Sequence, residues 1–209
     1  MELPRNAKRF QLATFVLVPL YAALPLVFGF QMQVLAQPLA PREPEQLPLR
    51  GETKPFVFKD RIIEPQYEYR IEALLLSRKR YRFDAVADLS PLDFALGWGD
   101  MSDRTTLQSI HVSQGGRWYR WSSRDVPISS QAISRQSANV HVIPATKDLA
   151  NRLKKAKEGQ VIRLVGNLVN VKQHGEIVWT SSTTRNDTGS KSCEVLWVEK
   201  FQIIRPNRD

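Results

Sequence analysis

The stretch "GQVIRLVGNLVNVKQHGEIVWTSSTT", residues 159–184, decides the fold that we predict for this chain of 209 residues. Its first half carries apolar residues on both faces of an extended backbone, which is typical of a strand at the centre of a sheet. His174 and Gly175 then provide a turn, and a second extended run returns along the first. The stretch therefore predicts a long central strand with a hairpin partner.

Two other segments also have the pattern of strands. In "YEYRIEALLLS", residues 67–77, apolar and polar residues alternate, so this strand is half-buried and becomes apolar on both faces toward its end. "CEVLWVEKFQII", residues 193–204, supplies a final strand. Together with the central hairpin, these segments predict a β-rich domain.

Two segments have the start and stop signals of helices. "SPLDFALGWG", residues 90–99, predicts a short helix with Ser90 as its N-cap and glycines at its end. "IPATKDLANRLKKAKEG", residues 143–159, gives a stronger signal, because Thr146 can cap it and one face is apolar. The residues of that face are Leu149, Leu153 and Ala156.

Strands, then a helix, then long strands resemble a small barrel of the OB type, in which a helix interrupts a partly open five-stranded barrel. We therefore expect an α+β, mostly β domain with two or three short helices, preceded by one N-terminal transmembrane helix. OB-like domains use a strand face and loops to bind oligonucleotides or oligosaccharides. This resemblance concerns the fold and assigns no site residue.

Three stretches together resemble uncharacterised bacterial proteins that carry an N-terminal hydrophobic segment. They are "ALGWGDMSD" (95–103), "SANVHVIPA" (137–145) and "DTGSKSCEVLWVE" (187–199). The resemblance implies anchoring or export, and it brings no established activity and no catalytic residue.

Residues 1–36 predict a signal anchor. Three basic residues precede residues 11–41, which contain no Asp, Glu, Lys or Arg. We assign residues 12–34 to the membrane, since a spanning helix needs about 20 apolar residues. The positive-inside rule then places the C-terminal domain in the periplasm of a bacterium, with the anchor in the inner membrane. The alternative is a secreted protein cleaved after Ala36.

The rest of the chain divides into a spacer and one domain. Residues 37–55 contain five prolines, which favour an extended stalk. Residues 56–209 suit a single domain. The chain has a net charge of +9 and one cysteine, so burial rather than an internal disulfide must stabilise it. The positive charge favours an anionic partner without selecting one.

The candidate binding residues come from "LQSIHVS" (107–113) and "GGRWYRWSSRD" (115–125), which predict a hairpin. If Gly115 and Gly116 form its loop, Val112 pairs with Tyr119 and Ile110 with Trp121, and these four share the core face. A loop at Gln114 and Gly115 slides the pairing by two residues and leaves the faces unchanged.

The opposite face of this hairpin presents His111, Trp118 and Arg120, and we predict these three as the binding residues. A tryptophan beside an arginine can stack on a ring or hold an anionic group. The alternative is that Trp118 and Arg120 only stack on each other or lie under the helices, because strands favour aromatic residues whatever their function.

Catalytic residues are not assigned. Ser137, Asn139 and His141 share one face of a strand, and Asp103 could orient a base, so a Ser/His/Asp or a Cys193/His arrangement can be written. However, the sequence lacks a nucleophile elbow, and no ligand spacing or phosphate loop predicts a metal or cofactor. Cys193 is expected to be a buried, small hydrophobic residue.

These observations favour a non-enzymatic binding or scaffolding component of a bacterial envelope assembly, with an envelope protein as its partner. The alternatives are a binder of acidic polymer or single-stranded nucleic acid, which would use a basic OB-like surface, and an exported hydrolase.

Overall fold

The computed structural model describes residues 37–125, 127–184 and 192–204. The predicted membrane segment, residues 12–34, and the alternative cleavage position after Ala36 lie outside these residues. Within the described ranges, no helix has both the length and the apolar character that crossing a bilayer requires.

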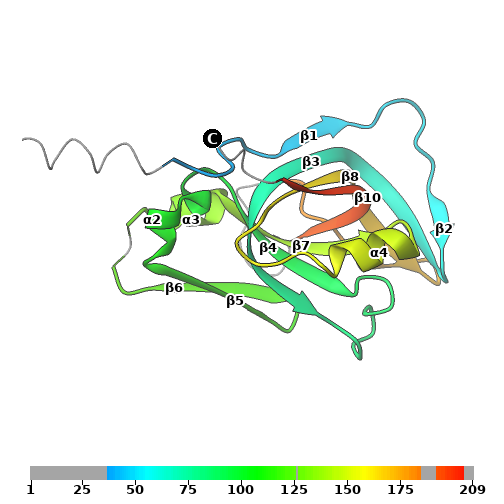
Figure 1. Ribbon diagram of the computed structural model, residues 1–209. Coiled ribbons are helices and arrows are strands. Elements are labelled where there is room, and N and C mark those ends of the chain that lie inside the picture. The colour runs from blue at the N-terminus through cyan, green and yellow to red at the C-terminus, as the bar shows by residue number, and fades with distance from the viewer. Residues whose placement is uncertain (1–36, 126, 185–191, 205–209) are drawn as a thin grey trace, which may run out of the picture. The chain divides into compact units, whose positions relative to one another are not determined.

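The described chain is mostly β with short helices, which confirms the predicted class (Figure 1). The strands are β1 (Glu45–Pro48), β2 (Phe56–Phe58), β3 (Arg61–Arg80), β4 (Leu92–Gly97), β5 (Ile110–Gly115), β6 (Trp118–Ser123), β7 (Ser137–Pro144), β8 (Val161–Gln173), β9 (Glu176–Trp179) and β10 (Glu194–Ile204). The helical elements are η1 (Gly99–Ser102), α2 (Arg104–Leu107), α3 (Ser130–Arg135) and α4 (Lys147–Leu153).

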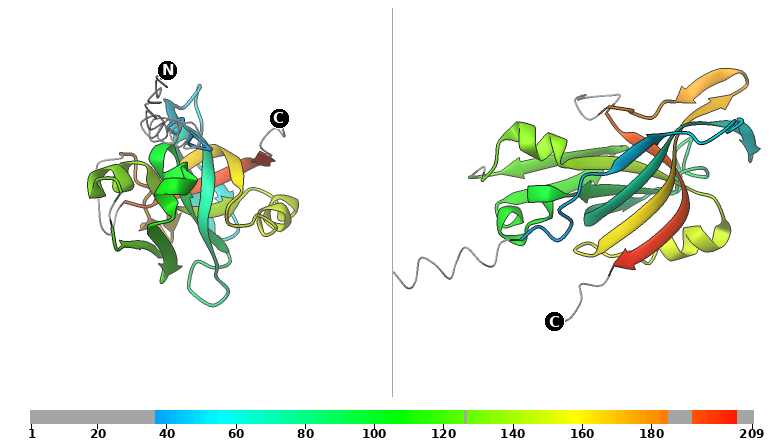
Figure 2. Two further views of the ribbon diagram at one scale, coloured as in Figure 1. Left: turned by 60° about the vertical axis from the view of Figure 1, so that its left-hand side comes forward. Right: turned by 90° about the horizontal axis from the view of Figure 1, so that it is seen from above.

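Five of these strands form a closed ring, which we call the barrel. β3 pairs with β4 through its C-terminal part and with β8 along most of its length. The ring is completed by β4 beside β7, β7 beside β10 and β10 beside β8. Only the contact between β7 and β10 is parallel among these five pairings. Figures 1 and 2 show the long, bent β3, which closes the ring because it pairs with β4 on one side and with β8 on the other.

The interior of the barrel is filled by side chains that alternate along its strands. Tyr69, Ile71, Ala73 and Leu75 of β3 are all buried there, as the alternation in residues 67–77 predicts. On α4, the predicted apolar face packs into the same core. The hydroxyl of Thr146 accepts a hydrogen bond from the amide of Leu149 at 3.1 Å and caps the helix as expected.

The prediction of a central strand is confirmed for β8, which lies between β3 and β10 and also pairs with β9. Gly166 in the middle of β8 faces a bulge in β10 between Val198 and Lys200. A Cβ atom at Gly166 would lie 1.8 Å from the carbonyl oxygen of Trp197. Glycine is therefore required by the close approach of the two backbones.

The prediction of a helix over residues 90–99 is wrong. Residues 92–97 form β4, which lies between β3 and β7 and is buried on both faces. The capping pattern at Ser90 and Asp93 is outweighed by a run of apolar residues that the core can take up only in an extended form. The Asp93 carboxylate, instead of capping a helix, accepts a hydrogen bond from Arg117.

The hairpin of β5 and β6 has the predicted faces but a different register. The predicted pairs of Val112 with Tyr119 and Ile110 with Trp121 are wrong, because Val112 pairs with Trp121 and Ile110 with Ser123. The turn residues are Gly116 and Arg117, with φ values of 60° and 69°.

Positive φ at both central residues is the geometry of a tight hairpin turn, which usually needs Gly or Asn at both positions. Arg117 adopts it because its side chain is held on the barrel, as described below.

Part of the segment expected to be a stalk lies against the domain. β1 pairs with residues 67–70 of β3, and Ala40 is buried. The amide of Ala40 donates a hydrogen bond to the hydroxyl of Ser102 at 3.0 Å. Residues 49–55 join β1 to β2, and most of them are exposed.

Candidate functional site

Arg117 fastens the tip of the β5–β6 hairpin to the barrel. Its guanidinium donates hydrogen bonds to the carboxylates of Asp84 and Asp93, each at 2.8 Å, and to the carbonyl of Ser90 at 2.9 Å. The same group lies 3.7 Å from the ring centroid of Tyr81, which is a close cation–π contact. The hairpin tip and the loop between β3 and β4 therefore form one rigid unit.

The centre of this unit is the buried carboxylate of Asp93, whose side chain has no exposed surface. One oxygen, Oδ1, receives the hydrogen bond from Arg117, and Nδ1 of His141 lies 2.9 Å from it. The imidazole of His141 also packs against Trp179, with ring centroids 4.5 Å apart. A buried charge is tolerated only when it is paired, and Arg117 supplies the cation here.

Burial and the neighbouring charged groups shift the pKa values of two residues in the loop between β3 and β4. Burial by itself would raise the pKa of Asp84, but hydrogen bonds from Arg117 and the backbone of Val86 outweigh it, so this pKa lies below its ordinary value. Burial, and after it the negative charge of Asp93, raises the pKa of Tyr81. Asp84 therefore stays ionised, and Tyr81 stays neutral, near pH 7.

A groove of about 280 Å³ lies beside this unit. Its walls come from the hairpin tip, from β7, from β9 with the residues after it, and from the residue before β10. Its lining includes the side chains of Trp118, His141, Ile177, Val178, Trp179 and Cys193. The groove thus combines two tryptophans, two aliphatic residues and a histidine on a rigid base.

Three apolar side chains that line the groove are exposed. Trp118 is 38% exposed, Ile177 55% and Val178 45%. Phe83, which does not line the groove, is 96% exposed in the loop between β3 and β4 that Arg117 fastens through Asp84. Figure 2 shows this loop projecting from the body of the domain.

The structure brings only one of the three predicted binding residues into the groove. His111, Trp118 and Arg120 do share the exposed face of the hairpin, as predicted. However, Trp118 lines the groove, whereas His111 lines a different hollow near the other end of the hairpin. Arg120 lies between them, opposite Ser113.

The polar strand face in residues 137–145 is confirmed, and its members have different roles. His141 lines the groove, while Nδ2 of Asn139 lies 3.6 Å from Sγ of Cys193. Cys193 is half-buried at the edge of the groove rather than in the core. Asp103 accepts hydrogen bonds from two amides at the start of α2, so it caps that helix.

Sequence reasoning missed Asp84, Asp93, Arg117 and Trp179. The sequence does contain an indication of the role of Arg117, because an arginine that directly follows two glycines can occupy the hairpin turn itself. Within the described ranges, no group of three or more His, Cys, Asp or Glu side chains is arranged to hold a metal ion.

Comparison with known proteins finds no matching family model, no similar curated protein and no similar solved structure.

Proposed function

We propose that this protein is a non-enzymatic binding component of a bacterial envelope assembly, held in the inner membrane by residues 12–34. In this proposal the barrel is of the OB type, and the groove beside Trp118 holds an envelope protein partner. The anchor rests on the apolar N-terminal sequence, and the binding site rests on the groove and its exposed surroundings.

Two features support the OB assignment. Five strands close into a ring, and α4 stands between β7 and β8 in the chain and packs into the core of the ring. OB domains bind ligands on a strand face and through the loops beside it. The groove has the corresponding position, since it lies over β7 and is bordered by the segment between β8 and β10.

The observation that carries the proposal is the set of exposed apolar side chains that line the groove, Trp118, Ile177 and Val178, beside the network of Arg117. Protein interfaces concentrate their binding energy in a few aromatic and aliphatic anchors, and exposed apolar clusters mark such surfaces. Because Arg117 and Asp84 fix the loop and the hairpin in advance, less conformational entropy is lost on binding.

Charge favours a protein partner over a polyanion at this groove. The cation of Arg117 is fully compensated, since it is paired with both Asp84 and Asp93. Polyanion binding depends on uncompensated cations and weakens steeply with salt. We therefore expect partner binding at the groove to change little between low and moderate ionic strength.

Site-specific photocrosslinking tests the proposal. A benzophenone amino acid replaces Ile177 or Trp118 in cells, and the same residue at the exposed Lys155, beyond α4, is the control. We expect one discrete protein adduct from positions 118 and 177 and none from position 155. Adducts that are absent from both groove positions, or that are the same at all three, would refute a partner site here.

A second candidate, an exported thiol hydrolase, is favoured by one observation. His141, a residue type that can act as a base, and Cys193 line the same groove, and Nδ1 of His141 lies 2.9 Å from Oδ1 of Asp93. The variant Cys193→Ala separates the two candidates. A hydrolase loses its turnover of ester or amide substrates in this variant, whereas the binding protein keeps its crosslinks.

A further inference from the structure

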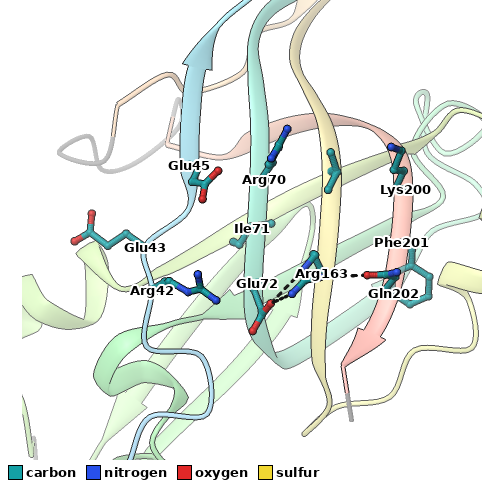
Figure 3. Close-up of a pocket in the computed structure, with 11 residues that line it drawn as sticks. Arg42, Glu43, Glu45, Arg70, Ile71, Glu72, Arg163, Lys200, Phe201 and Gln202 are labelled. Atoms are coloured by element: carbon teal, nitrogen blue, oxygen red, sulfur yellow. Dashed lines mark hydrogen bonds and ion pairs between the residues drawn. The ribbon is translucent and has the colours of Figure 1, made fainter. Parts of the chain in front are cut away.

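A second hollow, of about 470 Å³, lies on the outer face of the barrel across β3, β8 and β10, beside the segment that leads into β1 (Figure 3). It shares no residue with the groove. Its charged lining consists of Arg42, Arg70, Arg163 and Lys200 together with Glu43, Glu45 and Glu72.

Two of the cations flank an apolar residue in one row of the sheet. Val165 of β8 lies opposite Arg70 of β3 on one side and opposite Lys200 of β10 on the other. Neighbouring strands are about 4.8 Å apart, so the Cα atoms of Arg70 and Lys200 are separated by roughly 10 Å. Figure 3 shows both side chains on the same face of the sheet. Because both side chains are long, their charged ends can reach one anion bound between the two strands.

The carboxylates of the hollow do not neutralise these cations. Glu72 is occupied by Arg163, whose Nε donates to it at 3.0 Å. Among the described residues, no carboxylate lies within ion-pair distance of Arg42, Arg70 or Lys200.

The other two carboxylates are placed differently. Glu45 lies opposite Arg70 in the sheet register without forming an ion pair, and Figure 3 shows Glu43 directed away from the hollow. Three cations from three elements are therefore left facing a single concave surface.

We propose that this hollow binds a phosphate group. An arginine fork and a lysine point charge together match the several acceptor oxygens and the negative charge of a phosphate. A neutral ligand would gain little from three uncompensated cations. The phosphate belongs either to an anionic lipid headgroup or to a soluble phosphate-bearing polymer. This site and its test are independent of the groove and of the partner proposed above.

Calorimetric titration of the full chain in a neutral detergent tests the site. The probes are inorganic tripolyphosphate and a short-chain phosphatidylglycerol. The double variant Arg70→Gln with Lys200→Gln removes the two flanking cations. Its control, Lys155→Gln with Lys157→Gln, removes the same charge from exposed positions beyond α4. All four side chains are exposed, and thermal unfolding verifies that both variants fold.

We expect the double variant to bind at least tenfold more weakly, while the control differs from the wild type by less than threefold. The slope of log affinity against log salt falls by about two in the double variant only. Binding of both probes supports a site for phosphate in general, and binding of the lipid alone supports a headgroup site. If the wild type binds neither probe, or if the double variant and the control weaken binding equally, the proposal is wrong.

Discussion

Replacing Arg117 with asparagine removes the cation that neutralises the buried Asp93 carboxylate while leaving the hairpin turn unstrained. Asparagine tolerates the left-handed conformation that position 117 requires, where φ is 69°. Any loss of stability in Arg117→Asn therefore reports on the side-chain contacts with Asp84, Asp93, Ser90 and Tyr81.

The magnitude follows from the burial of the two carboxylates. The side chain of Asp93 is 0% exposed, and removing one partner of such a buried pair costs about 3–5 kcal/mol. The side chain of Asp84 is 36% exposed, so solvent screens its pair and limits its share to about 1 kcal/mol or less. We therefore expect Arg117→Asn to lower the free energy of unfolding by about 3–5 kcal/mol.

Urea unfolding of the detergent-solubilised full chain at pH 7 measures this loss. The matched control is Arg120→Asn, since Arg120 is exposed on β6 in the same hairpin and its loss is expected to change stability by at most about 0.5 kcal/mol. Adding Asp93→Asn to Arg117→Asn removes the unpaired charge and should restore about 1–3 kcal/mol. A loss below about 1 kcal/mol in Arg117→Asn, or no restoration by Asp93→Asn, would refute the reasoning.

Three further predictions concern stability and are checked by thermal or urea unfolding. Gly166→Ala should lower the free energy of unfolding by about 1–3 kcal/mol or more, because the new Cβ meets the Trp197 carbonyl. Gly115 has open space around it, so Gly115→Ala should be nearly neutral. Equal losses in the two variants would contradict this prediction. Asp84→Asn should be less stable than the wild type at pH 7, because the pKa of Asp84 in the folded protein lies below its ordinary value of 3.8. The difference in the free energy of unfolding should shrink as the pH falls below 3.8, and a constant difference from pH 7 to pH 2 would contradict this prediction. Thr146→Ala should lower the free energy of unfolding by about 1 kcal/mol, and Thr146→Ser, which keeps the capping hydroxyl, should lower it much less. Equal losses in these two variants would contradict a capping role.

Local pattern was sufficient to predict the elements whose burial follows a regular spacing of apolar residues. β3 alternates, β8 is apolar on both faces, and α4 has a capped apolar stripe, so each follows from spacing alone. β4 was mispredicted because Ser90 and Asp93 imitate a helix start, and only the neighbouring strands β3 and β7 determine that this run is extended.

The candidate site was predictable only in part. The alternation of the hairpin places Trp118 on its exposed face, and the structure agrees. The network of Arg117 with Asp84 and Asp93 joins residues that are far apart in sequence and have no spacing in common. That network also holds the turn at Gly116 and Arg117, which is why reasoning from turn residues alone gave the wrong register.

The pairing of β3 with β8 has a consequence for biosynthesis. β3 is made early, but one wall of its ring consists of β8 and β10, which are the last long strands to leave the ribosome. The nascent chain therefore holds an unpaired edge of β3 until residues 161–173 have been synthesised. The ring itself closes only when β10 lies between β7 and β8, so the core of the barrel is completed after most of the described chain has left the ribosome.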